Sequence, residues 1–251
     1  MCRLLGWAAS KPISLAGLLG EADLAAFTEL SCKHGDGWGL AHAAGDGVVV
    51  QKAPDAARLS PAFAEAASDA RELAMVHLRW ATLGLPVCVD NAHPFTDGRL
   101  ALAHNGSISP PQSLDPLLDD RVRSLLSGDT DSERFFLAIL SRLPDGAADD
   151  DEIGRAYADT VRAIAGSLAF SSLNSMLLTP TRLFAVCCFD PDAEARESEP
   201  EYYRMRYRTT AGAVVVCSSG WGSGWQELGN GELLSVDRGS LTLTVSPLDL
   251  P

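Results

Sequence analysis

A cysteine at the second position is the residue with the shortest route to covalent chemistry in this sequence. Removal of Met1 would make Cys2 the N-terminal residue and place its thiol beside a free α-amine. Such an amine has an ordinary pKa of about 7.7 to 8.0, which suits a general base at neutral pH. N-terminal nucleophiles are activated in this way. Because a Cys at position 2 is more often an accident of sequence, the catalytic hypothesis needs support from other residues.

Two polar motifs follow apolar runs, where a loop would present them to a ligand. Arg79 comes just after a buried stretch, and its planar fork of donors can hold a carboxylate bidentately or form a structural ion pair. Asn105 and Gly106 set an amide side chain beside an unhindered backbone N–H. These two groups are the parts of an oxyanion hole, although the same dipeptide is also typical of a simple turn.

Three further motifs have simpler explanations that also permit a functional role. Residues 34–39 pack three glycines into six positions, which is typical of a tight turn. His93, followed by a proline, could be a packed histidine in a turn. Asp131 lies in a Thr-Asp-Ser-Glu run that predicts a helix cap at Thr130 or Asp131. A capping aspartate can still direct a carboxylate oxygen at a ligand ammonium.

Composition excludes several classes of protein. The 251 residues carry 20 Lys plus Arg against 33 Asp plus Glu, a net charge of −13 that disfavours nucleic acid and anionic membrane surfaces as partners. No apolar stretch approaches the roughly 20 residues of a membrane helix, and no secretory signal is visible. We expect a cytoplasmic protein, and in that compartment its six cysteines should stay reduced. None lies in a Cys-x-x-Cys pair that would suggest zinc or redox chemistry.

The hydrophobic pattern predicts strands at both ends of the chain and helices in the middle. No repeat or linker divides the sequence, so residues 1–251 are expected to form one domain. Helices are predicted at 21–30, 61–72, 131–143 and 152–165. Strands are predicted at 47–52, 73–80, 100–104, 175–178, 183–189, 202–208, 213–217, 232–236 and 240–245. This order indicates an α+β protein with helices covering stacked sheets, and not a doubly wound α/β fold.

The ordered motifs together resemble the class II glutamine amidotransferase domain, a branch of the N-terminal nucleophile hydrolases. They are Cys2-Arg3, His77-x-Arg79-Trp80-Ala81-Thr82, Asn91-x-His93-Pro94, His104-Asn105-Gly106 and Thr130-Asp131-Ser132-Glu133. The motifs cover about residues 2–140, and the β-rich remainder is consistent with the rest of such a domain. The resemblance implies a four-layer αββα sandwich.

The resemblance also implies a role for each matching residue. Cys2 would attack the γ-amide carbon of glutamine or of a γ-glutamyl compound, with Asn105 and Gly106 holding the oxyanion. Arg79 would bind the substrate α-carboxylate and Asp131 its α-ammonium. Trp80, Thr82 and His93 would line or support the pocket. Water would then resolve a γ-glutamyl thioester, which releases glutamate and ammonia or an amine; no cofactor or metal is implied.

Two departures from the family pattern bear on the substrate. Leu83 stands where the relatives that make amino sugars usually have His, and the 34–39 loop resembles stand-alone γ-glutamyl hydrolases of ergothioneine and glutathione metabolism. The residues after the motifs leave no room for an acceptor domain within the 251 residues, so we expect the acceptor to be another chain or none. The sequence therefore favours a stand-alone γ-glutamyl amidohydrolase acting on a small molecule.

Several alternatives remain open. One is a glutaminase subunit that supplies ammonia to a synthetase partner chain, for which residues 202–208 offer an ambiguous interface beside the simpler explanation of an amphipathic strand with a solvated basic face. Another is a non-catalytic glutamine-binding regulator, against which Cys2, Asn105 and Gly106 argue by their presence. A metal site at His77, His93, His104 and Cys88 lacks a ligand spacing such as His-x-x-x-His. The leaving group and the oligomeric state, a homo-oligomer included, are not determined by the motifs.

Overall fold

A seven-stranded antiparallel sheet is built mainly from the two ends of the chain. The computed structural model describes residues 2–81, 86–146, 148–193, 201–218 and 223–250. The sheet has the order β13-β11-β12-β1-β4-β2-β3. Its strands are β1 (Arg3–Ile13), β2 (Trp38–Ala44), β3 (Gly47–Ala53), β4 (Arg71–Leu78), β11 (Met205–Thr209), β12 (Ala213–Cys217) and β13 (Gln226–Leu228). The N-terminal strand β1 is therefore central, paired with β12 on one side and β4 on the other.

A six-stranded sheet packs against the first, with the order β15-β14-β10-β9-β6-β5. Its strands are β5 (Phe95–Thr96), β6 (Ala101–Asn105), β9 (Asn174–Leu178), β10 (Arg182–Cys187), β14 (Glu232–Asp237) and β15 (Leu243–Pro247). A short pair is formed by β7 (Ile108–Ser109) and β8 (Ala169–Phe170). The inner faces of the two sheets share one apolar cluster, in which Leu4 and Met75 meet Met176 and Leu183.

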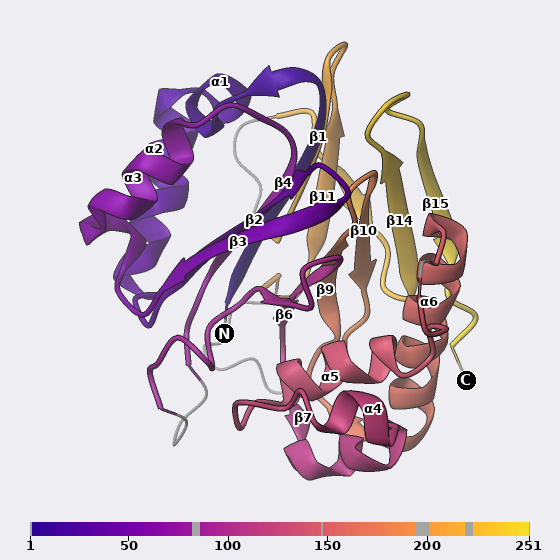
Figure 1. Ribbon diagram of the computed structural model, residues 1–251. Helices are drawn as coiled ribbons and strands as arrows, with labels where there is room; N and C mark the ends of the chain where they lie inside the picture. Colours follow the sequence, from indigo (N-terminus) through magenta and orange to yellow (C-terminus); the bar gives the residue numbers. More distant parts are fainter. Residues whose placement is uncertain (1, 82–85, 147, 194–200, 219–222, 251) are drawn as a thin grey trace.

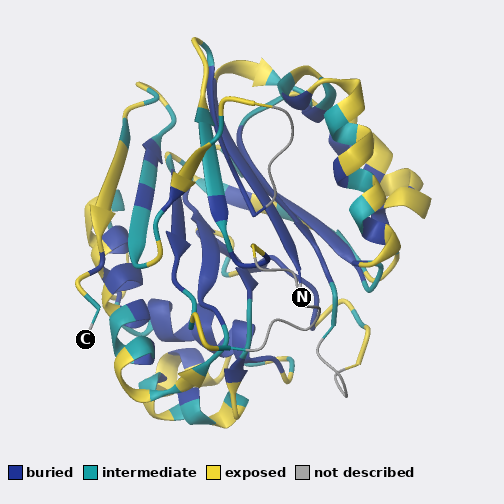
Figure 2. Ribbon diagram, turned by 180° about the vertical axis from the view of Figure 1, so that it is seen from behind, coloured by how far each residue is buried: buried dark blue, intermediate teal, exposed yellow. Residues whose placement is uncertain are grey.

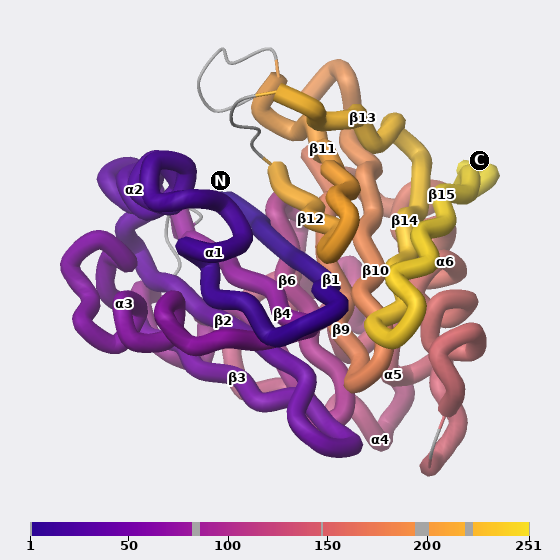
Figure 3. Tube along the Cα trace, turned by 90° about the horizontal axis from the view of Figure 1, so that it is seen from above, coloured from indigo at the N-terminus to yellow at the C-terminus, as the bar shows by residue number. Residues whose placement is uncertain are grey.

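Helices cover the outer face of each sheet (Figures 1 and 3). The elements beside the seven-stranded sheet are α1 (Leu15–Leu19), α2 (Glu21–Glu29), η1 (Leu30–Cys32), η2 (Ala57–Leu59) and α3 (Pro61–Ser68). The elements beside the six-stranded sheet are η3 (Pro111–Leu117), α4 (Asp120–Arg123), α5 (Asp131–Leu140) and α6 (Asp150–Ser167). Each layer buries its own apolar cluster, centred on Trp38 and Phe63 on the first side and on Phe135 and Tyr157 on the second.

The four layers confirm the expected αββα sandwich. Figure 2 shows buried residues concentrated in the strands and on the inner helix faces, with exposed residues on the outside. None of the described helices is long and apolar enough to cross a membrane.

Helix boundaries follow local capping. The Thr130 side chain accepts from the Glu133 N–H at 3.1 Å, which confirms the predicted cap and starts α5 at Asp131. Asp149 and Glu152 form a capping box at the start of α6, which begins two residues before the predicted helix. The prediction for 61–72 was wrong at its end, because α3 stops at Ser68 and Arg71 already belongs to β4.

The region around residues 202–208 also differs from its prediction. Tyr202 and Tyr203 precede β11, and the strand begins at Met205. Its arginines are engaged within the chain: Arg204 pairs with Glu227, and the guanidinium of Arg208 lies 4.8 Å from the Trp225 ring centroid. These contacts favour the amphipathic strand over a basic docking surface.

Candidate active site

The pairing of β1 with β4 brings Cys2 to the loop that carries Arg79. Arg3 lies opposite Leu78 in the antiparallel register, so the residue before β1 faces the residues after β4. The backbone N–H of Trp80 donates to the Cys2 Sγ at 3.4 Å, and the thiol donates to the Trp80 carbonyl at 3.7 Å. The thiol is buried, with 8% of the residue exposed. The N–H and the carbonyl of one residue, Trp80, therefore both hold the Cys2 thiol.

Arg79 is a buried cation with only long hydrogen bonds. Its guanidinium donates to the carbonyl of Asp36 at 3.4 Å and to that of Pro86 at 3.3 Å. The salt bridges within the described part of the chain do not include Arg79. A buried guanidinium without a carboxylate partner is suited to receive one from a ligand.

Asp131 reaches the same place from the first turn of α5. One carboxylate oxygen accepts from the Ile108 N–H at 2.6 Å, and the other accepts from the Ser132 N–H at 2.9 Å. Only 7% of the residue is exposed. The carboxylate is thus fixed by backbone donors while it lines the cavity beside Cys2. Capping of the helix by Thr130 leaves Asp131 available for this position.

Asn105 and Gly106 stand at the end of β6. Both polar atoms of the Asn105 side chain are buried without a hydrogen-bond partner among the described residues. A Cβ on Gly106 would lie 1.9 Å from the Ser172 carbonyl oxygen and 2.9 Å from the His104 Nε2. Only glycine fits this close approach. An unpaired buried amide is costly unless a ligand or water satisfies it, so Asn105 is suited to a ligand-binding role.

These elements enclose a small cavity of about 20 Å³. That volume holds about one water molecule, so a glutamine-sized ligand requires its walls to separate. The lining residues are Cys2, Arg79, Trp80, Ala81, Asn91, His93, His104, Gly106, Thr130, Asp131 and Ser132. The structure thus brings together six predicted residues, Cys2, Arg79, Trp80, His93, Gly106 and Asp131. Asn105 lies beside the lining, and Thr82 lies outside the described residues.

Five lining residues were not predicted as site residues although each lies inside one of the sequence motifs: Ala81, Asn91, His104, Thr130 and Ser132. His104 is fixed by two hydrogen bonds: its Nε2 donates to the Ser172 carbonyl at 2.9 Å, and its Nδ1 accepts from the Ser132 hydroxyl at 2.8 Å. Asn91 accepts from the Asp129 N–H at 3.2 Å and so joins its loop to the start of α5. The sequence signal was their place within the motifs; the contacts depend on the fold.

The histidines of the site are held neutral by burial. The rings of His77 and His93 lie 4.2 Å apart between centroids, and burial lowers the pKa of both well below the ordinary value of 6.5. Burial also lowers the pKa of His104, with Asp131 opposing the shift. Among the described residues, no three His, Cys, Asp or Glu side chains form a group that could hold a metal ion.

Burial also governs the thiol. It raises the pKa of Cys2 above 9.0, and the Trp80 hydrogen bond and the Arg79 charge act in the opposite direction. Burial therefore disfavours the thiolate, which is the form that attacks. Nucleophilic attack by Cys2 requires a base that removes the thiol proton.

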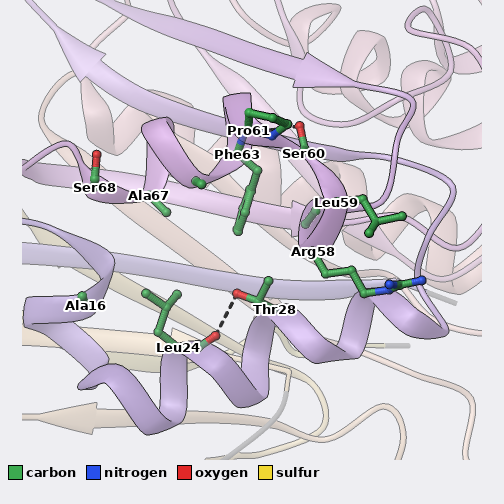
Figure 4. Close-up of a pocket in the computed structure, with 12 residues that line it drawn as sticks. Ala16, Leu24, Thr28, Arg58, Leu59, Ser60, Pro61, Phe63, Ala67 and Ser68 are labelled. Carbon is green, nitrogen blue, oxygen red and sulfur yellow. Dashed lines mark hydrogen bonds between the residues drawn. The ribbon is translucent and has the colours of Figure 1, made fainter.

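A larger cavity of about 460 Å³ lies elsewhere, between α2 and α3. Figure 4 shows Leu24 and Phe63 pointing into it. Its hydroxyl groups form hydrogen bonds with nearby backbone groups, as the Thr28 hydroxyl does by donating to the Leu24 carbonyl. Its lining has no thiol, amide or carboxylate side chain. The larger cavity therefore lacks the groups that amide hydrolysis needs.

Comparison with known proteins places almost the whole chain in one family. Residues 1–249 match the family model of glutamine amidotransferases class-II. The chain is 25% identical to a gamma-glutamyl-hercynylcysteine sulfoxide hydrolase of Mycobacterium tuberculosis, over 97% of the chain and 96% of that protein. A glutamine–fructose-6-phosphate aminotransferase (isomerizing) of Caulobacter vibrioides is 39% identical, over 39% of the chain and 15% of that protein. A solved glutamine aminotransferase class-II domain protein from Silicibacter pomeroyi has a TM-score of 0.68 at 19% identity, with full coverage of both chains.

With nearly the whole chain matched, this protein belongs to the class II glutamine amidotransferases. The family and the hydrolase relative identify it as an enzyme with amidohydrolase activity. Its fold is that of the N-terminal nucleophile hydrolases.

Proposed function

We propose that this enzyme hydrolyses the γ-amide bond of glutamine or of a γ-glutamyl compound through a thioester on Cys2. The observation that carries the proposal is the convergence of three groups on one buried cavity: a thiol, a cation with no carboxylate partner among the described residues, and a fixed carboxylate. Arg79 and Asp131 supply the opposite charges that complement the α-carboxylate and α-ammonium of a glutamyl group. We further infer that residues 1–251 work as one glutamine amidotransferase domain.

Acylation begins once Met1 is removed and the α-amine of Cys2 is free. The amine takes the thiol proton, directly or through a water molecule, and Sγ forms a bond to the γ-carbonyl carbon. The side chain of Asn105 and the N–H of Gly106 stabilise the oxyanion, and the loss of one such donor typically costs about 2.7 to 4 kcal/mol. The C–N bond of the substrate then breaks as the α-amine of Cys2 delivers the proton to the leaving nitrogen.

Deacylation uses water as the second nucleophile. The α-amine of Cys2 takes a proton from water, and the resulting hydroxide attacks the thioester carbonyl at the same oxyanion site. The C–S bond breaks, the thiol regains its proton, and glutamate leaves. The balanced reaction consumes one water and yields glutamate with ammonia or an amine.

The hydrolase relative supports a γ-glutamyl compound as the substrate class. It aligns with this chain over nearly its full length, whereas the Caulobacter aminotransferase aligns over only 15% of its own length. A hydrolase of this kind releases its amine product to water and needs no partner for the second half of a transfer.

The experiment is the intact mass of the purified protein before and after incubation with 6-diazo-5-oxonorleucine, a glutamine analogue that alkylates a thiol held in a glutamine site. We expect loss of Met1 and a single adduct that maps to Cys2. The Cys2→Ala variant should stay folded and show neither adduct nor turnover. Glutamate release from glutamine and from a panel of γ-glutamyl amines then ranks the leaving groups.

Normal turnover by Cys2→Ala would exclude the thioester mechanism. A mature wild-type chain that neither reacts nor releases glutamate from any member of the panel would instead favour a glutamine-binding regulator. Glutamate release only after addition of a synthetase chain would favour a glutaminase subunit.

A further inference from the structure

The glycine-rich loop at residues 34–37 lies directly against the segment that holds Cys2. The loop precedes β2. The last pair of β2 with β4 is Trp38 with Leu78, and the backbone pairing continues from there into the loop. The Arg79 N–H donates to the Gly37 carbonyl at 2.8 Å, and the Asp36 N–H donates to the Arg79 carbonyl at 3.1 Å. The loop and the Arg79 segment thus form one hydrogen-bonded unit.

The side chain of Asp36 adds a contact that the backbone does not provide. Its Oδ2 accepts from the Ala81 N–H at 2.8 Å, while its carbonyl accepts from the Arg79 guanidinium at 3.4 Å. Asp36 therefore holds both residues that flank Trp80. Between them lies Trp80, whose N–H donates to the Cys2 thiol and whose carbonyl accepts from it.

The loop is also anchored to the helical layer beside the seven-stranded sheet. The His34 N–H donates to the Leu30 carbonyl at 3.0 Å, and the buried His34 ring contacts the Trp80 ring edge-on at 5.5 Å between centroids. A half-buried aspartate on such an anchored loop provides a fixed acceptor.

We propose that Asp36 is a positioning residue for the nucleophile. Its carboxylate fixes the Ala81 N–H and with it the Trp80–Ala81 peptide, whose carbonyl accepts from the Cys2 thiol and orients Sγ towards the substrate carbonyl. The inference rests on the proposed function, since the orientation of the thiol matters only if Cys2 attacks the substrate. The role requires an acceptor oxygen at this position and does not require its negative charge.

The test compares Asp36→Ala with Asp36→Asn, which keeps an acceptor oxygen and removes the charge. The control is Asp237→Ala, because Asp237 also accepts a loop N–H, that of Ser240 at 2.8 Å, but does not line the cavity. Each variant is assayed for kcat and KM with its best γ-glutamyl substrate, for the rate of Cys2 alkylation by 6-diazo-5-oxonorleucine, and for Tm.

We expect Asp36→Ala to lower kcat and the alkylation rate about tenfold or more, with a smaller change in KM, because a misplaced nucleophile loses near-attack geometry. Its Tm should fall no further than that of Asp237→Ala. Asp36→Asn should recover most of kcat with the wild-type shape of the pH profile. If Asp36→Ala does not fold, Asp36→Ser, whose hydroxyl is too short to reach the Ala81 N–H, takes its place.

Wild-type kcat and alkylation in Asp36→Ala would overturn the inference, as would an Asp36→Asn variant as slow as Asp36→Ala, which would assign the effect to charge. These results are distinct from failure of the proposed function. In that case the wild-type protein itself neither reacts at Cys2 nor releases glutamate.

Discussion

At the scale of single residues, the site depends on polar groups that the fold buries without giving them strong internal partners. Within the part of the chain that the structure describes, both polar atoms of the Asn105 side chain lack a partner, and Arg79 has two long hydrogen bonds to carbonyls. Asp131, in contrast, is held by short backbone bonds. The difference indicates that the carboxylate is preorganised, while the amide and the guanidinium keep donors free for a ligand.

Arg79 gives the sharpest prediction at this scale. We expect Arg79→Lys to raise KM for the γ-glutamyl substrate about 10- to 100-fold, which corresponds to the roughly 1.5 to 3 kcal/mol of hydrogen bonds to a charged group. A lysine is a point charge and cannot replace a bidentate fork. Steady-state kinetics measures the effect, and Tm reports the stability. The matched control is Arg99→Lys, at a cation 46% exposed in a surface pair with Asp97. An unchanged KM in Arg79→Lys would contradict the assignment of the α-carboxylate to Arg79.

At the scale of elements, the site is assembled from strand ends and one helix start that the chain brings together over long separations. Cys2 precedes β1, Arg79 follows β4, Gly106 follows β6, and Asp131 begins α5. Lys52 on β3 donates to the Ala92 carbonyl at 2.7 Å, which ties the loop before His93 to the seven-stranded sheet. Small residues permit the closest of these approaches.

Gly39 on β2 shows what such an approach requires. A Cβ there would lie 2.1 Å from the His93 carbonyl oxygen, so Gly39→Ala must push the His93 loop outward. We expect this variant to lower the free energy of unfolding by about 1 to 3 kcal/mol, as overpacking does, and to reduce activity because His93 lines the cavity. Urea unfolding and kcat measure the two effects. Gly212→Ala is the control, because a Cβ there meets only the Ser10 hydroxyl at 3.5 Å. Equal stabilities of the two variants would show that the loop can yield without cost.

Sequence patterns predicted the helices and strands with a strong hydrophobic periodicity. They missed a strand that forms because of its pairing with neighbouring strands. α5, α6 and the strands near 175–178 and 213–217 were predicted within a few residues. β2 was not predicted, because Gly39, Ala41 and Ala43 are small residues without a clear alternation and the strand exists through its partners β3 and β4. The motifs contain every residue that lines the cavity beside Cys2. The contact of Asp36 with Ala81, separated by 45 positions, has no local signal.

At the scale of the whole molecule, buried neutral histidines link the stability of the fold to pH. His77, His93 and His104 lie in the middle of the structure, and burial lowers the pKa of each in the folded state. In the unfolded chain they take up protons near the ordinary pKa of about 6.5. Below that pH the unfolded state therefore binds more protons than the folded state, and the free energy of unfolding falls. Above it the contribution is fully present.

We therefore expect Tm and the free energy of unfolding to fall as the pH drops from about 7.5 to 5.5, with each such histidine contributing up to about 1.4 kcal/mol per pH unit below its unfolded pKa. The acidic groups act in a separate pH window: backbone hydrogen bonds hold the pKa of Asp119 and Asp237 below 3.8, so their contribution is lost only at lower pH.

Between about pH 7.5 and 5.5, His77→Gln should lose less stability than the wild-type protein, because it removes one of the proton-binding groups. The partly exposed His42, replaced in His42→Gln, provides the control. Urea unfolding at each pH measures the slopes. If His77→Gln and the wild-type protein lose the same stability between these pH values, His77 takes up no extra proton on unfolding and the buried ring is not the source of the acid sensitivity.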